Sequence, residues 1–411
     1  MKRNFRIVVG MLLLAIPLCM NAQVKPVKPQ QNPDKDRIEK AEMEKLEKEQ
    51  REKDRREKAK SMGGFEMPKI SGFVQGMYMA NLDEEGQFVS NTFRMRRVRM
   101  SIEGTLVKGL TYKIQGDFSR SPMLVDGFLK YKPCNEFAIQ VGQFKTPFSI
   151  ESPINPVNLE IFDYGESIQK LVGYSDVCGV GALGRDLGIM ATGSLFPVEM
   201  QNGQKFSIVD YSIGLFNGNG ANQLDNNNRK DLVGRLDIHP GLKNLTLSGS
   251  YYNGKYKKDD TNNGSRNRWS VGAQYNDGDL VLRAEYLNGF TGYQVEAFND
   301  TIPVLDGQGN QVYVERFRHS KGYYAVAGYN FKLGKDKSQK LMPVLRYEHY
   351  APGDMNDIVY GGSNFYTVGI NYWPLKSVNF KVDYSFIQKG NVGDPGTTNK
   401  HRIVGILSYK F

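Results

Sequence analysis

Apolar and polar residues alternate with a period of two throughout residues 69–411, and this pattern constrains the fold more than any other feature. In the second expected strand, for example, Val98 and Met100 alternate with Arg97 and Arg99. Alternation over about ten residues, interrupted by turn residues, is typical of transmembrane β-barrels, in which every second side chain faces lipid. Strands of soluble sandwiches usually have only about five or six residues. The pattern therefore predicts an all-β fold, an antiparallel up-and-down transmembrane β-barrel over residues 69–411.

The alternating stretches predict about sixteen strands, separated by connections of unequal length. The expected spans are 69–80, 92–106, 110–119, 125–132, 136–145, 184–196, 205–217, 230–238, 244–254, 268–276, 279–290, 321–331, 341–350, 362–373, 377–388 and 400–411. Short turns such as 107–109 should lie at one end of the barrel, and the long connections 146–183, 291–320 and 389–399 at the other. Short periplasmic turns and long outer loops characterise outer-membrane barrels. An even strand number also places both ends of the barrel chain on the periplasmic side.

Residues 1–22 have the order of a cleaved signal peptide. Three basic residues fall within residues 2–6, an apolar stretch follows, and Ala22 offers a small residue before the cut. Cys19 raises the alternative of a lipoprotein, but Leu18 is bulkier than the residue that a lipid-attachment site prefers. We therefore expect an exported protein of the outer membrane of a Gram-negative bacterium.

Residues 23–68 are expected to lie in the periplasm, ahead of the barrel. Prolines among polar residues in 23–33 indicate an extended linker. In 34–60, 21 of the 27 residues are charged, and basic residues lie three or four places from the glutamates, which favours a helix. We interpret this short charged helix as a solvated spacer, roughly 40 Å long. The alternative is an oligomerisation or tethering helix.

The charge and cysteine content exclude several classes of partner and fold. Of the formal net charge of +10, about +5 remains in the barrel. A mildly basic barrel favours small anions in its lumen but gives no reason to expect nucleic acid. Cys134 and Cys178 are the two cysteines after residue 22, and the strand pattern places them at opposite ends of the barrel. We therefore expect no disulfide.

Charged residues recur on the face of the strands that alternates with the apolar face. Arg235 and Asp237 share this face, and similar pairs occur at 283–285, 346–348 and 381–383. Such charges would cost about 2–4 kcal/mol facing lipid near the midplane, so they should line a water-filled interior. The pairs fit either a lattice of ion pairs that stiffens the wall or a basic stripe that guides anions, and the stripe is favoured for Arg97 and Arg99. The predicted pore-lining basic residues are Arg97, Arg99, Lys113, Arg235, Arg283, Arg346, Lys381 and Arg402.

The longest connection, residues 146–183, follows the fifth expected strand. A loop of this length within a compact architecture is usually functional. We expect it to fold into the lumen and narrow it; the alternative is a lid that lies outside the barrel. The residues expected to shape the constriction are Lys145, Pro147, Phe148, Glu151 and Lys170.

Little in the sequence supports catalysis or metal binding. The four histidines, His239, His319, His349 and His401, show no metal-ligand spacing. Ser175 lies in Gly-Tyr-Ser-Asp-Val, which lacks the second glycine of a nucleophile elbow. We therefore expect no enzyme activity, no metal and no cofactor.

Three runs of residues carry a resemblance to a known family. They begin at Phe93 (Phe-Arg-Met-Arg-Arg-Val-Arg-Met-Ser-Ile-Glu-Gly), at Val141 (Val-Gly-Gln-Phe-Lys-Thr-Pro-Phe-Ser-Ile-Glu) and at Gly184 (Gly-Arg-Asp-Leu-Gly). Over roughly residues 69–411 the chain resembles the phosphate-selective porin O and P family. The resemblance implies a sixteen-stranded porin, usually a homotrimer, that passes anions such as phosphate or pyrophosphate. The last strand ends at Phe411 and likewise resembles the signal for the outer-membrane assembly machinery.

One departure from the family bears on the expected function. Phosphate-binding members carry arginines in the in-folded loop, whereas 146–183 contains Lys170 as its only cation. We therefore expect a passive diffusion porin for small hydrophilic solutes with mild anion preference, and a phosphate-selective channel as the runner-up. Two functions of other classes remain as alternatives. One is an outer-membrane structural anchor whose helix 34–60 binds a periplasmic partner, and the other is an outer-membrane lipid hydrolase.

Overall fold

The computed structural model describes most of the chain after residue 66. The described residues are Gln50, Glu52, Asp54, 67–176, 178, 183–199, 205–241, 244–257, 263–296, 298–299, 302–303, 307–308, 313–334, 337–354 and 358–411. The predicted signal peptide and nearly all of the predicted charged helix lie outside these residues; the three described positions within 34–60 are helical. No helix among the described residues is long and apolar enough to cross a bilayer.

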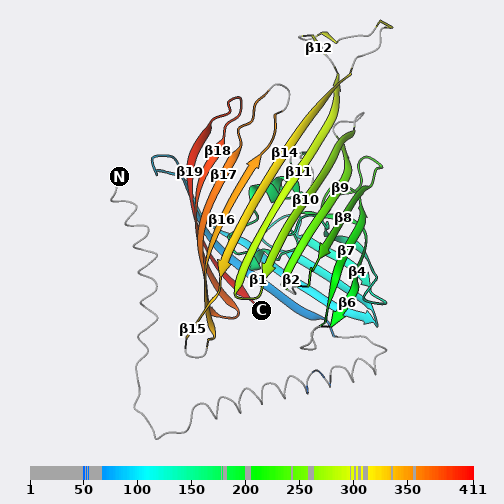
Figure 1. Cartoon of the computed structure of the whole chain (residues 1–411), viewed down its shortest axis with the longest axis vertical. Helices are drawn as coiled ribbons and strands as arrows, with labels where there is room; N and C mark the ends of the chain where they lie inside the picture. Colours follow the sequence, from blue (N-terminus) through cyan, green and yellow to red (C-terminus); the bar gives the residue numbers. More distant parts are fainter. Residues whose placement is uncertain are drawn as a thin grey trace. The chain divides into compact units, whose positions relative to one another are not determined.

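Long antiparallel strands form a closed barrel (Figure 1). Each strand pairs with its neighbours in sequence, and β1 pairs with both β2 and β19, which closes the sheet. The described sheet has seventeen strands, but the short β15 (Phe331–Leu333) continues β14 along β16, so the wall has sixteen long strands, as predicted. These are β1 (Lys69–Leu82), β2 (Phe88–Val107), β3 (Leu110–Asp117), β4 (Leu124–Tyr131), β5 (Ala138–Lys145), β6 (Arg185–Glu199), β7 (Lys205–Phe216), β8 (Asp231–Ile238), β9 (Leu245–Lys257), β10 (Asn263–Asn276), β11 (Leu280–Glu296), β14 (Tyr313–Tyr329), β16 (Gln339–Ala351), β17 (Ser363–Leu375), β18 (Val378–Gly390) and β19 (Thr397–Lys410).

The predicted extents of two long connections are wrong, because strands continue into both of them. In place of the connection 291–320, β11 and β14 remain paired from Leu280 and Tyr329 as far as Glu296 and Tyr313. Between them, β12 (Phe298–Asn299) pairs with β13 (Ile302–Pro303). Likewise, β18 and β19 extend into the predicted connection 389–399 and leave only 391–396 between them. Ladder hydrogen bonds need no apolar side chains, so the strands continue beyond the point where the apolar alternation stops.

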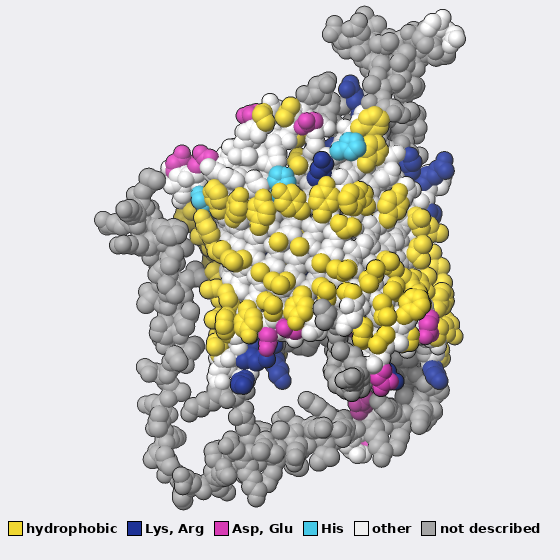
Figure 2. Space-filling view, viewed as in Figure 1, with side chains coloured by type: hydrophobic (Ala, Val, Ile, Leu, Met, Phe, Trp, Pro, Cys, Tyr) yellow, Lys and Arg dark blue, Asp and Glu magenta, His cyan; other side chains and the backbone are white. Residues whose placement is uncertain are grey.

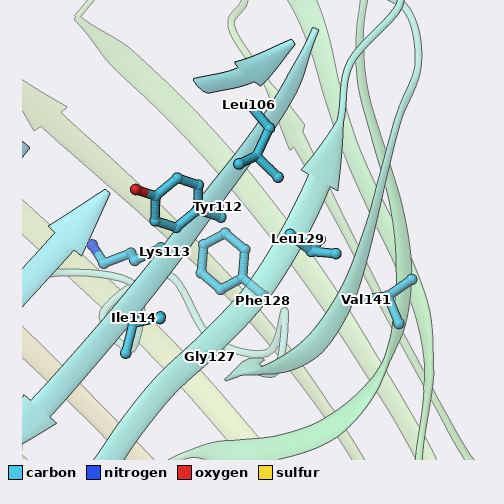
Figure 3. Close-up of a pocket in the computed structure, with 8 residues that line it drawn as sticks. All are labelled: Leu106, Tyr112, Lys113, Ile114, Gly127, Phe128, Leu129 and Val141. Atoms are coloured by element: carbon cyan, nitrogen blue, oxygen red, sulfur yellow. The ribbon is translucent and has the colours of Figure 1, made fainter. Parts of the chain in front are cut away.

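The wall has an apolar outer face and a polar inner face. On β16, the side chain of Leu345 is 61% exposed, whereas the neighbouring Arg346 is 4% exposed. Figure 2 shows hydrophobic side chains gathered in a band across the visible face, with charged side chains beyond its edges. On the outer face of β3–β5, a hollow of about 400 Å³ is lined by residues that include Ile114, Leu129 and Val141 (Figure 3). This division is what a lipid-embedded barrel requires.

The first and last strands place both ends of the barrel chain at one rim, which we call the terminal rim. The connection between β2 and β3 at this rim has only two residues, 108–109. The connection between β5 and β6 starts from the opposite rim, which we call the outer rim. In outer-membrane barrels the rim with the short turns faces the periplasm.

Candidate functional site

Residues 146–183, between β5 and β6, contact many strands of the wall; we call them the β5–β6 segment. The segment contains the 3₁₀ turn η2 (Pro156–Asn158) and the helix α3 (Glu166–Leu171). Asn155 starts η2, because its Oδ1 accepts a hydrogen bond from the backbone N–H of Val157 at 3.3 Å and a proline follows it. Helix α3 contacts β11, β14 and β16, and Figure 1 shows it framed by the barrel strands.

Apolar side chains of the segment belong to a hydrophobic cluster within the barrel. Phe148, Ile168 and Leu171 are at most 1% exposed. The cluster members on the strands are Phe144, Phe216, Val233, Tyr252, Leu287, Tyr324, Val326, Val344 and Tyr350. A fully buried apolar side chain contributes about 1.5–3 kcal/mol, so contacts with the wall stabilise the segment more than its own short helix does.

Glu151 is the most deeply buried charge of the segment, and two arginines of the wall hold it. Its side chain is 0% exposed. Its Oε2 accepts hydrogen bonds from Arg283 on β11 at 3.3 Å and from Arg346 on β16 at 2.7 Å. A buried carboxylate is costly unless cations and hydrogen bonds compensate it, so this site fixes where the start of the segment lies.

The other four carboxylates of the segment also pair with cations of the wall. The pairs are Glu160–Arg283 (2.6 Å), Asp163–Arg97 (3.1 Å), Glu166–Lys389 (3.4 Å) and Asp176–Arg268 (2.7 Å). The segment carries five carboxylates and one cation, so its charge is complementary to that of the arginines around it. Another placement of the segment would leave several buried ions uncompensated.

Two carboxylates of the wall accept hydrogen bonds from the segment, whereas the contacts above join carboxylates of the segment to cations of the wall. Glu285 on β11 accepts hydrogen bonds from the hydroxyl of Ser149 at 2.8 Å and from the backbone N–H of Ile150 at 3.0 Å. Glu348 on β16 accepts from the backbone N–H of Ser167 at 2.7 Å, in the first turn of α3. A carboxylate at this position satisfies a free N–H group of the helix and matches its dipole.

The four cation–anion pairs predicted along single strands have different outcomes. Two of them form as direct ion pairs: Arg235–Asp237 (2.8 Å) and Arg346–Glu348 (3.4 Å). Arg283 instead binds the carboxylates of the segment, and Lys381 donates to the backbone carbonyls of Leu159 and Ile161. Arg235 also donates to the carbonyl of Ser149 at 2.7 Å. The wall therefore uses these cations mainly to hold the segment.

Arg97 and Arg99, for which the sequence favoured a basic stripe that guides anions, are both ion-paired. Arg99 pairs with Asp117 of β3 at 2.9 Å, and both side chains are at most 4% exposed. Arg97 pairs with Asp163 of the segment. Their charges are thus largely neutralised by carboxylates that come from other parts of the chain.

The remaining predicted residues differ in how they are held. Lys113 lies 3.8 Å from Glu103, in a partly exposed pair. The guanidinium of Arg402 stacks over the ring of Phe162, with 4.4 Å to the ring centre. Lys170 is half-buried in the last turn of α3. Lys145 donates to the hydroxyl of Tyr164 at 2.9 Å and Pro147 is buried.

Several cations of the interior escaped the sequence-based prediction. Arg96 lies at a β-bulge, because Gln75 pairs with Arg97 while Gly76 pairs with Met95. The bulge puts Arg96 on the same side as Arg97, and both bind Asp163. The other missed cations are Arg120, Arg185, Arg266 and Arg268. The five carboxylates of the segment were a signal for three of these cations, since Arg96 pairs with Asp163, and Arg266 and Arg268 pair with Asp176.

The closed barrel, with an apolar belt outside and paired charges inside, defines an outer-membrane porin. The family model described as "Phosphate-selective porin O and P" matches residues 71–411, and the chain belongs to this family. Members are channels and not enzymes. The described residues contain no cluster of three or more His, Cys, Asp or Glu that could hold a metal ion.

Solved porins share the fold at low sequence identity. The anion-selective porin from Comamonas acidovorans is 14% identical, with 84% of this chain and 99% of that chain covered and a TM-score of 0.56. The outer membrane channel DcaP of Acinetobacter baumannii is 12% identical, with 84% and 97% covered and a TM-score of 0.52. OmpT of Vibrio cholerae, solved in a trimer form, is 11% identical, with 84% and 99% covered and a TM-score of 0.51. No curated protein matches the chain.

Proposed function

We propose that the protein is a passive channel for small hydrophilic solutes with a mild preference for anions, and that the β5–β6 segment narrows its passage. Partly exposed cations of the interior support this proposal. All five carboxylates of the segment pair with cations of the wall. Among the described residues, no carboxylate lies within salt-bridge distance of Arg120, Lys170 or Arg402. Unmatched cations along a narrow polar passage attract anions and repel cations.

The proposed passage runs past the charged groups of the interior that remain partly exposed. Arg120, Lys170 and Arg402 are each of intermediate exposure. The side chain of Asp163 is 24% exposed and that of Lys389 is 43% exposed, in contrast to the fully buried Glu151. Charged groups that are exposed to water in the interior are also accessible to a passing solute. These residues should therefore set the ion selectivity.

Reversal potentials in planar bilayers, measured across a potassium chloride gradient, test this proposal. We expect wild-type protein to favour chloride over potassium. Lys170→Gln combined with Arg402→Gln should bring the permeability ratio toward one. Lys108→Gln, in the exposed turn between β2 and β3, removes a lysine at the terminal rim and should leave the ratio unchanged. A cation-selective wild type, or an unchanged ratio in the double variant, would refute the proposal.

A phosphate-selective channel is the second candidate. The description of the family model favours it, and so does Arg120, whose Nε has no hydrogen-bond partner among the described residues. A guanidinium binds phosphate through two parallel hydrogen bonds. Phosphate added to a chloride solution should then reduce the chloride current in a saturable manner, and Arg120→Gln should abolish this block. A purely additive current would indicate the general diffusion channel.

We also propose a homotrimer of exported chains that begin at Gln23. The trimer form of the similarly folded OmpT supports the assembly. Phe411 exchanges two backbone hydrogen bonds with Gly72, at 3.0 and 3.1 Å, so its side chain is held at the terminal rim, where assembly factors could bind it. Native mass spectrometry should show three chains, each lacking residues 1–22.

A further inference from the structure

The outer wall carries a second hollow, of about 550 Å³, over β10, β11, β14 and β16. Its floor is made of Ala273, Ala284 and Ala325, which are directly opposite one another on three successive strands. Leu282, Leu345 and Tyr347 also line it and are larger. The hollow has the volume of a small-molecule pocket, yet it opens on the lipid-facing side of the barrel.

The outward positions of β14 change in character from the outer rim toward the hollow. They are, in order, His319, Lys321, Tyr323, Ala325 and Ala327, and all five are exposed. This order follows the outer part of a membrane profile: cationic or polar groups at head-group depth, an aromatic ring at the interface, and then a recess among the acyl chains that extends to Leu245 and Tyr275 at the terminal-rim ends of β9 and β10. Figure 2 shows histidines at the upper edge of the hydrophobic band.

Two rings stack on the outer-rim side of the hollow, and a lysine follows them on β14. His349 is directly opposite Tyr323, and their rings stack with centres 5.1 Å apart. Lys321 is the next outward residue on β14 toward the outer rim, and it is diagonal to His349. Nδ1 of His349 is 2.8 Å from Oδ1 of Asn364. In this contact Nδ1–H donates to the amide oxygen and orients the ring, so Nε2 donates to a phosphate only in the doubly protonated, imidazolium form.

We propose that this surface binds one phosphorylated lipid of the outer leaflet. One acyl chain fills the alanine hollow, and a phosphate lies between Lys321 and His349. Acyl chains gain no hydrophobic free energy by moving from bulk lipid to the wall, so shape and head-group charge must select the occupant. The exposed Lys321 supplies a charge complementary to a phosphate, which a neutral lipid lacks.

The lipid site is separate from the passage of ions. Its residues face outward, whereas Lys170 and Arg402 belong to the interior, so the site depends only on the outer-membrane location. Variants of the site should bind lipid less well while single-channel conductance stays at the wild-type value. Failure of the anion-preference proposal would leave this inference intact.

Native mass spectrometry of the purified full-length protein tests the site, with diphosphoryl lipid A and its fully dephosphorylated form as probes. We expect wild type to retain one diphosphoryl molecule per chain and to retain the dephosphorylated form more weakly. Lys321→Gln with His349→Gln should weaken retention of the diphosphoryl form about fivefold or more, since one charge near an anionic lipid contributes about 1 kcal/mol. Ala284→Phe with Ala325→Phe should fill the hollow and abolish retention of both forms.

A matched control replaces Val382, a partly exposed apolar residue on the outer face of β18, with phenylalanine. This variant should retain lipid like wild type. Equal retention by wild type and both double variants would overturn the proposal, as would equal retention of the two lipid forms by wild type. Loss of the oligomer in the alanine variant, with lipid retention unchanged, would show that a second copy of the chain occupies the hollow, and would also overturn it.

Discussion

Two stretches of this chain, residues 146–183 and 291–320, look alike in sequence as long connections, yet they take different structures. The first leaves the sheet after Lys145 and packs against the wall through α3 and a hydrophobic cluster. The second continues the sheet at both of its ends, because β11 and β14 stay paired as far as Glu296 and Tyr313. Connection length alone therefore does not decide what such a stretch does.

The difference follows from what each stretch offers to its surroundings. The β5–β6 segment brings five carboxylates and several large apolar residues to a wall that carries buried arginines. The flanks of the second stretch continue to pair with each other through backbone hydrogen bonds across the hairpin. We conclude that charge and shape complementarity to the wall hold the first stretch in place, and strand pairing holds the second.

The largest expected effect comes from Glu151→Gln. This change removes the anion shared by Arg283 and Arg346 and leaves two buried guanidinium groups short of a partner. Loss of one member of a buried charge pair typically costs about 3–5 kcal/mol, and here the cost should fall on attachment of the segment. We expect faster proteolysis within 146–183 and a noisier open-channel current, while the barrel remains folded.

Glu166→Gln is the matched control within the same segment. Its partner Lys389 has a side chain that is 43% exposed, and such pairs contribute at most about 1 kcal/mol. Proteolysis and current noise should therefore stay close to wild type. If both variants behave alike, buried charge does not hold the segment, and the contrast between the two stretches loses its explanation.

Acidification should also weaken attachment of the segment, but only at low pH and less than Glu151→Gln does. Burial alone would raise the pKa of Asp176, but the charge and hydrogen bonds of Arg268 outweigh it and lower the pKa below its ordinary value. The same holds for Asp163 beside Arg96 and Arg97. A carboxylate with a lowered pKa stabilises the folded state fully above its unfolded pKa of about 3.9, and this contribution is lost as the pH falls through the lowered value.

Single-channel noise recorded between pH 7 and pH 3 checks this expectation. The noise should stay constant down to about pH 4 and rise below it, because only then do Asp163 and Asp176, whose pKa values are lowered, take up protons. A transition near neutral pH would mean that other groups, such as histidines, control the segment.

Much of the fold could be predicted because lipid imposes a strict rule on the wall. Every second side chain must be apolar, so strands such as β16 and β18 stand out in the sequence. The points where the strands end at the outer rim could not be predicted. Beyond the lipid, strand pairing continues without alternating apolar residues, as in β11. The bulge at Arg96 also escaped, because nothing in a run of arginines shows which one breaks the alternation.

The interior was predictable in its charges but not in its pairing. The alternation alone predicts that Arg283 and Arg346 lie on the inner face of the wall. That Glu151 lies between them depends on the path of the segment backbone across more than a hundred residues of chain. A path of this kind leaves no periodic signal. The surplus of carboxylates in 146–183 was the one available sign that the segment meets basic partners.

The smallest effect should follow from shortening the second stretch. Replacing residues 297–312 by Asn-Gly joins Glu296 and Tyr313, which lie directly opposite each other, through a two-residue turn that suits a hairpin. Since pairing of β11 and β14 holds this region, we expect an unchanged thermal unfolding temperature and conductance. Deletion of 155–163, as a contrast, removes Glu160 and Asp163 with their ion pairs and should alter both measurements. An equal loss in the two deletions would show that the second stretch also holds the channel together, and would end the distinction between them.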